Sequence, residues 1–299
     1  MNLSQLKSGK WIVPALFVML HILFYLFAIN NGHPFTKDSS EYLWQSFNIA
    51  DHSSFYCGDL NAPIVEAWFN QRPPGYGLFL SVLGINQIHF NYSLLLAVQL
   101  LLSMLNGVVV YRFVKLLAGD GFSLWLLLIP LIGFPTQFVY SGMVMSEILF
   151  QSLLLLSVYF IAILLKKGEM QFLWWSQWCI TASFLVKPVA WMFPFVAFVS
   201  FLIYWFNKKV KLMAIVTFAI PFTAILWMFS YSHAKTGVYE FSSIQRKLMI
   251  NYNSFAILSD AQGKENAVRT ISNLQDSVSK FNYVDKCNGI DAFNKSVLK

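Results

Sequence analysis

Long apolar runs recur along this chain, and they constrain its fold more than any other feature. A helix needs about 20 mostly apolar residues to cross the hydrocarbon core of a bilayer. The run from Trp11 to Ile29 meets this requirement, and so do several later segments. Hydrophobic residues make up 57% of the 299 residues and charged residues 12%, with a mean hydropathy of +0.56. Such a composition excludes an ordinary soluble domain, so the sequence predicts an all-α, polytopic transmembrane helix bundle.

We expect about seven membrane spans, from the length and polarity of the apolar runs. They cover residues 11–29, 92–113, 122–140, 147–165, 171–187, 188–206 and 211–231. The N-terminus is expected in the cytoplasm, because the first apolar run is too long for a signal peptide and lacks a cleavage site. The lysine pairs at 166–167 and 208–209 then also fall in the cytoplasm, as the positive-inside rule requires. The net charge of +7 therefore reports topology and does not indicate nucleic-acid binding.

The chain divides into a transmembrane module, residues 1–231, and an outer-side tail, residues 232–299. The first outer loop covers residues 30–91. Its segment 75–90 is apolar but short and glycine-rich, so we expect interfacial helices there and no further span. The tail is polar and carries apolar residues at helical spacing, which predicts a small helical region.

Two carboxylates, Asp38 and Glu41, lie in the first outer loop a few residues after the first span. Residues three apart share one face of a helix. A carboxylate pair can act as a general base or hold a divalent cation. The alternative is an ordinary solvated loop, and spacing alone does not exclude it.

Arg72 precedes two prolines in the motif Arg-Pro-Pro-Gly-Tyr. Proline fixes its own backbone φ angle, so the arginine is held in place at the start of the apolar segment. A guanidinium in that position can bind a phosphate through two parallel hydrogen bonds. The alternative is a side chain that extends to the lipid headgroups.

Glu147 and Lys187 are charged residues at the outer ends of predicted spans. A carboxylate at the edge of the hydrocarbon is costly unless it faces a cavity or a partner, although a helix N-terminus also favours it. Lys187 is a lone cation on the side where the charge rule expects few. A phosphate, or a salt bridge with Glu147 or Asp38, would explain it.

Cysteine and histidine give weaker indications. Cys57 and Cys287 both fall on the predicted outer side, where an oxidising compartment would allow a disulfide; two unrelated thiols are the alternative. The outer-side histidines have no metal-ligand spacing, so a metal site is left open.

Taken together, these motifs resemble the GT-C polytopic glycosyltransferases. The similarity rests on Asp38 after the first span, Arg72-Pro-Pro-Gly-Tyr before an apolar segment, Ser-Glu147 at the start of a span and Lys187-Pro at an outer turn. The resemblance covers residues 11–250. Within the GT-C enzymes, the chain most resembles the branch that contains protein mannosyltransferases and aminoarabinose transferases.

The resemblance implies an inverting enzyme that moves a sugar from a polyprenyl-phosphate donor to an envelope lipid, glycan or protein. It assigns Asp38 as the catalytic base, with Glu41 as a helper or ligand of a divalent metal. Arg72 and Lys187 would bind the donor phosphate, and Glu147 would be an acidic support. The enzyme would lie in a bacterial inner membrane with its active site on the periplasmic side.

Other interpretations remain open. Family members usually carry further spans, so we expect residues 232–299 to begin a truncated C-terminal region. A transporter or flippase of lipid-linked sugars would share the cations, but it would be expected to show inverted repeats and charges at the membrane midplane. An envelope enzyme of the O-antigen polymerase or ligase type would also use lipid-linked glycans, but it would depend on a large outer loop late in the chain. A non-catalytic truncated membrane protein is a further alternative.

Overall fold

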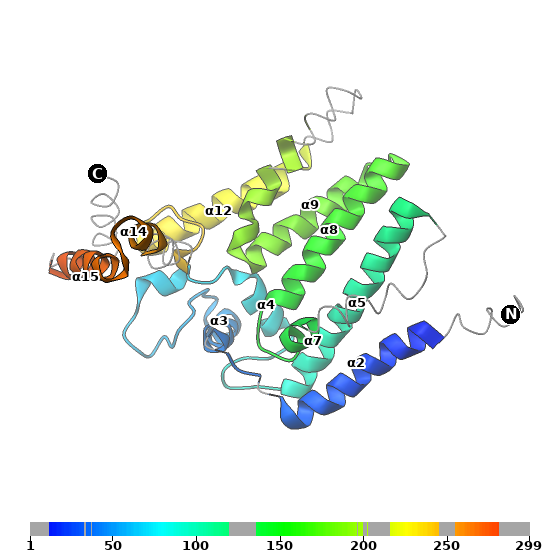
Figure 1. Cartoon of the computed structure of the whole chain (residues 1–299), viewed down its shortest axis with the longest axis horizontal. Helices are drawn as coiled ribbons and strands as arrows, with labels where there is room; N and C mark the ends of the chain where they lie inside the picture. The colour runs from blue at the N-terminus through cyan, green and yellow to red at the C-terminus, as the bar shows by residue number, and fades with distance from the viewer. Residues whose placement is uncertain are drawn as a thin grey trace, which may run out of the picture.

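All regular secondary structure in the described part of the chain is helical in the computed structural model shown in Figure 1. The structure describes residues 12–32, 34–36, 38–119, 136–195, 197–199, 202, 216–244 and 255–280. Within these ranges no strand is present, which confirms the predicted all-α class.

Three described helices are long and apolar enough to cross a membrane. They are α2 (Ile12–Asn31), α5 (Tyr92–Ala118) and α8 (Glu147–Lys167), with 20, 27 and 21 residues. Each one matches a predicted span. The predicted total of seven is not confirmed. Helix α9 (Gln171–Val186) has only 16 residues, and helix α12 (Ala219–Thr236), which covers most of the predicted span 211–231, is not among the three. Most of the predicted span 122–140 and part of 188–206 lie outside the described residues.

Hydroxyl and imidazole side chains join these helices where they pack. Helices α5, α8 and α9 lie side by side (Figure 1). Ser157 of α8 and Ser176 of α9 approach to 2.9 Å between their hydroxyl oxygens, and Nε2 of His21 on α2 lies 3.1 Å from the Ser103 hydroxyl on α5. Small polar residues commonly allow membrane helices to approach closely and bond in this way.

Short helices cover one end of this bundle. They comprise α3 (Ser39–His52), the 3₁₀ helix η1 (Glu66–Phe69), α4 (Pro74–Val82), α7 (Thr136–Ser141) and the 3₁₀ helix η3 (Pro188–Met192). Helix α4 has nine residues, far fewer than a span needs, which agrees with the predicted interfacial segment. Tyr42, Tyr76, Leu80 and Leu95 are buried together beneath these helices.

Further helices follow the bundle in the described residues. Helix α12 (Ala219–Thr236) leads into a segment that returns to η1, where the Ser243 N–H donates to the Asn70 carbonyl at 3.1 Å. Helices α14 (Phe255–Gln262) and α15 (Lys264–Lys280) follow, separated by Gly263 with a φ of 83°. Within the predicted tail, the described residues 255–280 thus form two helices with a glycine between them.

Candidate functional site

Arg72 connects the two carboxylates of the first outer loop. Its Nη2 lies 2.8 Å from Oδ1 of Asp38, and its Nε lies 2.6 Å from Oε2 of Glu41. The arginine side chain is only 10% exposed, whereas Asp38 is 41% exposed. The structure therefore brings together three residues that the sequence analysis singled out separately, and it leaves one carboxylate accessible to a ligand.

The start of α3 positions the two carboxylates. Asp38 is the residue before the helix, and Glu41 lies in its first turn. The positive end of a helix dipole favours negative charge at both positions. Ser39 fixes this end to the rest of the protein, because its hydroxyl donates to the Val144 carbonyl at 3.1 Å.

Prolines and glycines position the arginine. Pro74 begins α4, where its missing N–H removes no helical hydrogen bond. A Cβ on Gly75 would lie 2.6 Å from the Leu185 carbonyl oxygen of α9, so only glycine allows this approach. The Gln45 amide on α3 also donates to the Arg72 carbonyl at 2.9 Å. Main-chain contacts to two helices thus hold Arg72 rigidly, as the Pro-Pro motif predicts.

The charge on Arg72 is stabilised by its surroundings. Burial lowers its pKa, but the Tyr42 side chain and the carboxylates of Glu41 and Asp38 outweigh that effect and raise the pKa above its ordinary value. The guanidinium lies 5.2 Å from the centre of the Tyr42 ring. It therefore remains a cation throughout the accessible pH range.

A second ion pair joins Lys187 to Glu147. The lysine Nζ lies 2.7 Å from Oε1 of Glu147. Lys187 adopts an extended backbone between α9 and η3, as expected for a residue that precedes a proline. Glu147 is the first residue of α8, and its Oε2 is buried without a hydrogen-bond partner among the described residues. The salt bridge to Glu147 is one of the two explanations offered for the lone lysine.

Tyr42 lies between the two ion pairs. Its hydroxyl is 3.1 Å from the hydroxyl of Ser146, the residue before Glu147. Burial raises the pKa of Tyr42, although the nearby Arg72 lowers it. The phenol therefore stays protonated and can donate to a neighbouring oxygen. The sequence analysis gave this residue no role, although its position one after Glu41 placed it in the same motif.

Two amides next to Arg72 were also missed. Gln71 Nε2 donates to Oε1 of Glu41, and Asn70 Nδ2 donates to Oε1 of Glu240 at 2.9 Å. The Ser242 hydroxyl donates to the Gln71 carbonyl at 2.7 Å. The segment after α12 thus supports the loop that carries the arginine. Asn70 and Gln71 stand out because they are consecutive polar residues that are both buried. The sequence alone does not show burial, so it gave no indication of their role.

The structure does not directly test the metal site or the disulfide, both of which the sequence analysis left open. In the part of the chain that the structure describes, no group of three His, Cys, Asp or Glu side chains is arranged to hold a metal ion. Cys57 is buried, and Cys287 lies outside the described residues. The alternatives of a disulfide and of two unrelated thiols therefore both stay open.

Comparison with known proteins does not identify a family for this chain. No family model matches the chain. No curated protein matches it, and no solved structure matches it.

Proposed function

We propose that this protein is a membrane glycosyltransferase that moves a sugar from a polyprenyl-phosphate donor to an envelope acceptor. The observation that carries the proposal is the contact of Arg72 with both Asp38 and Glu41 beside apolar helices. A fixed, buried cation next to an accessible carboxylate supplies the two functions that such a reaction needs. The acceptor is a hydroxyl-bearing lipid, glycan or protein.

In the proposed reaction, Asp38 accepts the proton of the acceptor hydroxyl as its oxygen attacks the anomeric carbon of the sugar. The bond between that carbon and the phosphate oxygen breaks on the opposite face, so the configuration inverts. The polyprenyl monophosphate leaves with the bonding electrons. Arg72 and Lys187 stabilise the negative charge that develops on it, as fixed cations do in other transfer reactions.

For this role, Arg72 and Lys187 must each exchange a carboxylate partner for the donor phosphate. Arg72 and Lys187 each contact a carboxylate in the described structure. A donor phosphate that takes Nη2 of Arg72 would release the Asp38 carboxylate, which could then act as a base. Glu41 would keep Arg72 oriented through its Nε, and Glu147 would do the same for Lys187.

We further propose an inner-membrane location with this site on the outer side. Three apolar helices support membrane insertion. Lys166 and Lys167 lie at the end of α8 opposite Glu147, which agrees with a cytoplasmic position under the positive-inside rule.

The experiment uses purified protein in lipid vesicles with a panel of polyprenyl-phosphate sugars and an envelope extract as acceptor. Asp38→Asn should abolish transfer and retain binding of polyprenyl monophosphate, whereas Arg72→Ala should weaken that binding. Asp51→Asn, an exposed carboxylate at the other end of α3, is the matched control. Full transfer by Asp38→Asn would refute the assigned base. Donor efflux without sugar transfer would favour a flippase.

A further inference from the structure

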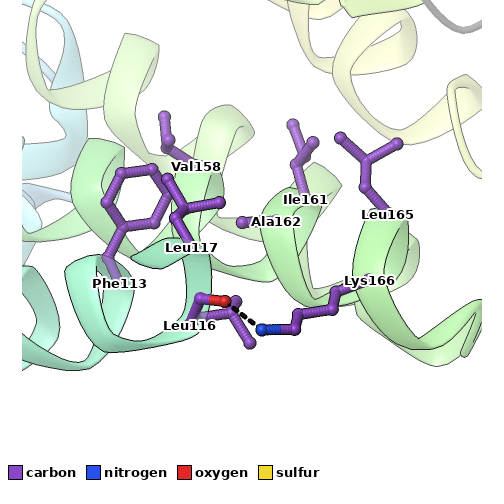
Figure 2. A pocket seen from close by; sticks show the side chains of 8 residues that line it. All are labelled: Phe113, Leu116, Leu117, Val158, Ile161, Ala162, Leu165 and Lys166. Atoms are coloured by element: carbon purple, nitrogen blue, oxygen red, sulfur yellow. Dashed lines mark hydrogen bonds between the residues drawn. The ribbon is translucent and has the colours of Figure 1, made fainter. Parts of the chain in front are cut away.

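An apolar groove lies at the end of the bundle farthest from the ion pairs. Figure 2 shows it between the last turns of α5 and α8, and its volume is about 430 Å³. Its lining consists of Phe113, Leu116, Leu117, Val158, Ile161, Ala162, Leu165 and Lys166. Glu147 and Lys166 are 19 residues apart on α8, or about 28 Å. That separation is close to the ~30 Å thickness of the bilayer hydrocarbon.

A single cation stands among these apolar residues. The Lys166 ammonium donates to the carbonyl of Leu116, one of the last carbonyls of α5, which have no partner within their helix (Figure 2). This bond holds the ammonium beside the groove. An ammonium has three N–H donors, and the structure gives Lys166 no carboxylate partner within the described ranges. Donors therefore remain for an external anion.

The surrounding charge is also positive. Arg112, Lys115, Lys166 and Lys167 are exposed at this end, and Glu169 is the one acidic residue in the described segments 112–119 and 166–170. Glu169 already accepts a hydrogen bond from Gln171. Basic pockets between helices on the cytoplasmic side are suited to anionic headgroups.

We propose that this groove binds an anionic phospholipid of the leaflet opposite the ion-pair site. One acyl chain would lie against Phe113, Leu117 and Val158, and the phosphate would accept hydrogen bonds from Lys166. The combination of hydrocarbon and charge identifies a lipid and not a free phosphate. A second apolar hollow, along one face of α2, is lined by Val18 and other apolar residues and by no charged residue. It therefore offers no cation to bind a lipid phosphate.

The test measures phospholipid bound to the purified full chain by native mass spectrometry, after exposure to equal amounts of phosphatidylglycerol and phosphatidylcholine. Lys166→Gln should lower retained phosphatidylglycerol about fivefold, the effect expected for one lysine near a headgroup. Lys167→Gln removes the neighbouring charge, which does not line the groove, and should lower retention less than Lys166→Gln does. Equal losses in both variants would indicate diffuse surface charge and overturn the proposal.

A second pair of variants tests the groove itself. Val158→Trp should obstruct it and lower retention, whereas Val18→Trp should not, although both valines are 43% exposed. Retention unchanged by Val158→Trp would place the lipid elsewhere and refute the site. If either tryptophan variant loses helical circular dichroism, the two lysine variants alone decide the outcome.

Discussion

The ion pair between Arg72 and Glu41 should contribute measurably to the stability of the protein. Its strength can be isolated with a double-mutant cycle built from Arg72→Met, Glu41→Gln and the double variant. Methionine retains much of the apolar stem of arginine, and glutamine retains the shape of glutamate. The cycle therefore removes the charges while the packing stays similar.

Burial sets the expected size of the coupling energy. The side chains of Arg72 and Glu41 are 10% and 24% exposed. Exposed pairs couple by about 0.2–1 kcal/mol, whereas breaking a fully buried pair costs about 3–5 kcal/mol. This pair is partly buried and has a short Nε contact, so we expect a coupling energy of about 1.5–3 kcal/mol. The pair between Lys187 and Glu147 is 29% and 22% exposed, and we expect about 0.5–1 kcal/mol there.

The assay is unfolding by sodium dodecyl sulfate in mixed micelles, followed by circular dichroism. Arg112→Met, which removes an exposed arginine, serves as the control and should change the free energy of unfolding by at most about 0.5 kcal/mol. A coupling energy near zero for Arg72 and Glu41, with both single variants folded, would refute the described contact.

Three further predictions concern packing, the buried phenol and the second cation. Gly75→Ala should destabilise the protein by about 1–3 kcal/mol, because the added methyl group meets a backbone carbonyl; Gly142→Ala, whose Cβ would meet its nearest atom at 3.5 Å, should be tolerated in the same unfolding assay. The raised pKa of Tyr42 means that the folded state keeps the phenol proton to a higher pH than the unfolded chain does. This contribution to stability is complete below about pH 10 and is lost as the pH rises further, so Tyr42→Phe should flatten the loss of stability above about pH 10. An unchanged slope would contradict that assignment. Lys187→Gln should weaken binding of polyprenyl monophosphate to vesicle-embedded protein and leave binding of the uncharged polyprenol unchanged. If the variant bound polyprenyl monophosphate as tightly as the unsubstituted protein does, a contact between Lys187 and the phosphate would be excluded.

Hydropathy predicted the long helices well because it depends on local composition. The predicted span 92–113 begins where α5 begins, but α5 continues to Ala118. Charged residues such as Arg112 and Lys115 mark the end of the apolar run from which the span was predicted, but they do not end the helix. Helix α9 ends at Val186, one residue before the predicted end, because Lys187 precedes a proline.

The candidate site was predictable only in part. Asp38, Glu41 and Arg72 drew attention because charge is rare in this chain, and the structure joins them. The support of Gln71 by Ser242 was not predictable, since these residues are 171 positions apart. Both are ordinary polar residues whose burial follows from tertiary packing, and neither belongs to a periodic or charged pattern.

The two ion pairs described above also determine which compounds could compete for the site. Because Arg72 and Lys187 already have internal counter-ions, an incoming anion replaces one negative partner with another, and the net electrostatic gain is small. Most of the affinity for a lipid-linked donor would then come from its hydrocarbon tail. Water-soluble sugar phosphates without that tail should therefore be poor inhibitors, even where their headgroup matches the donor.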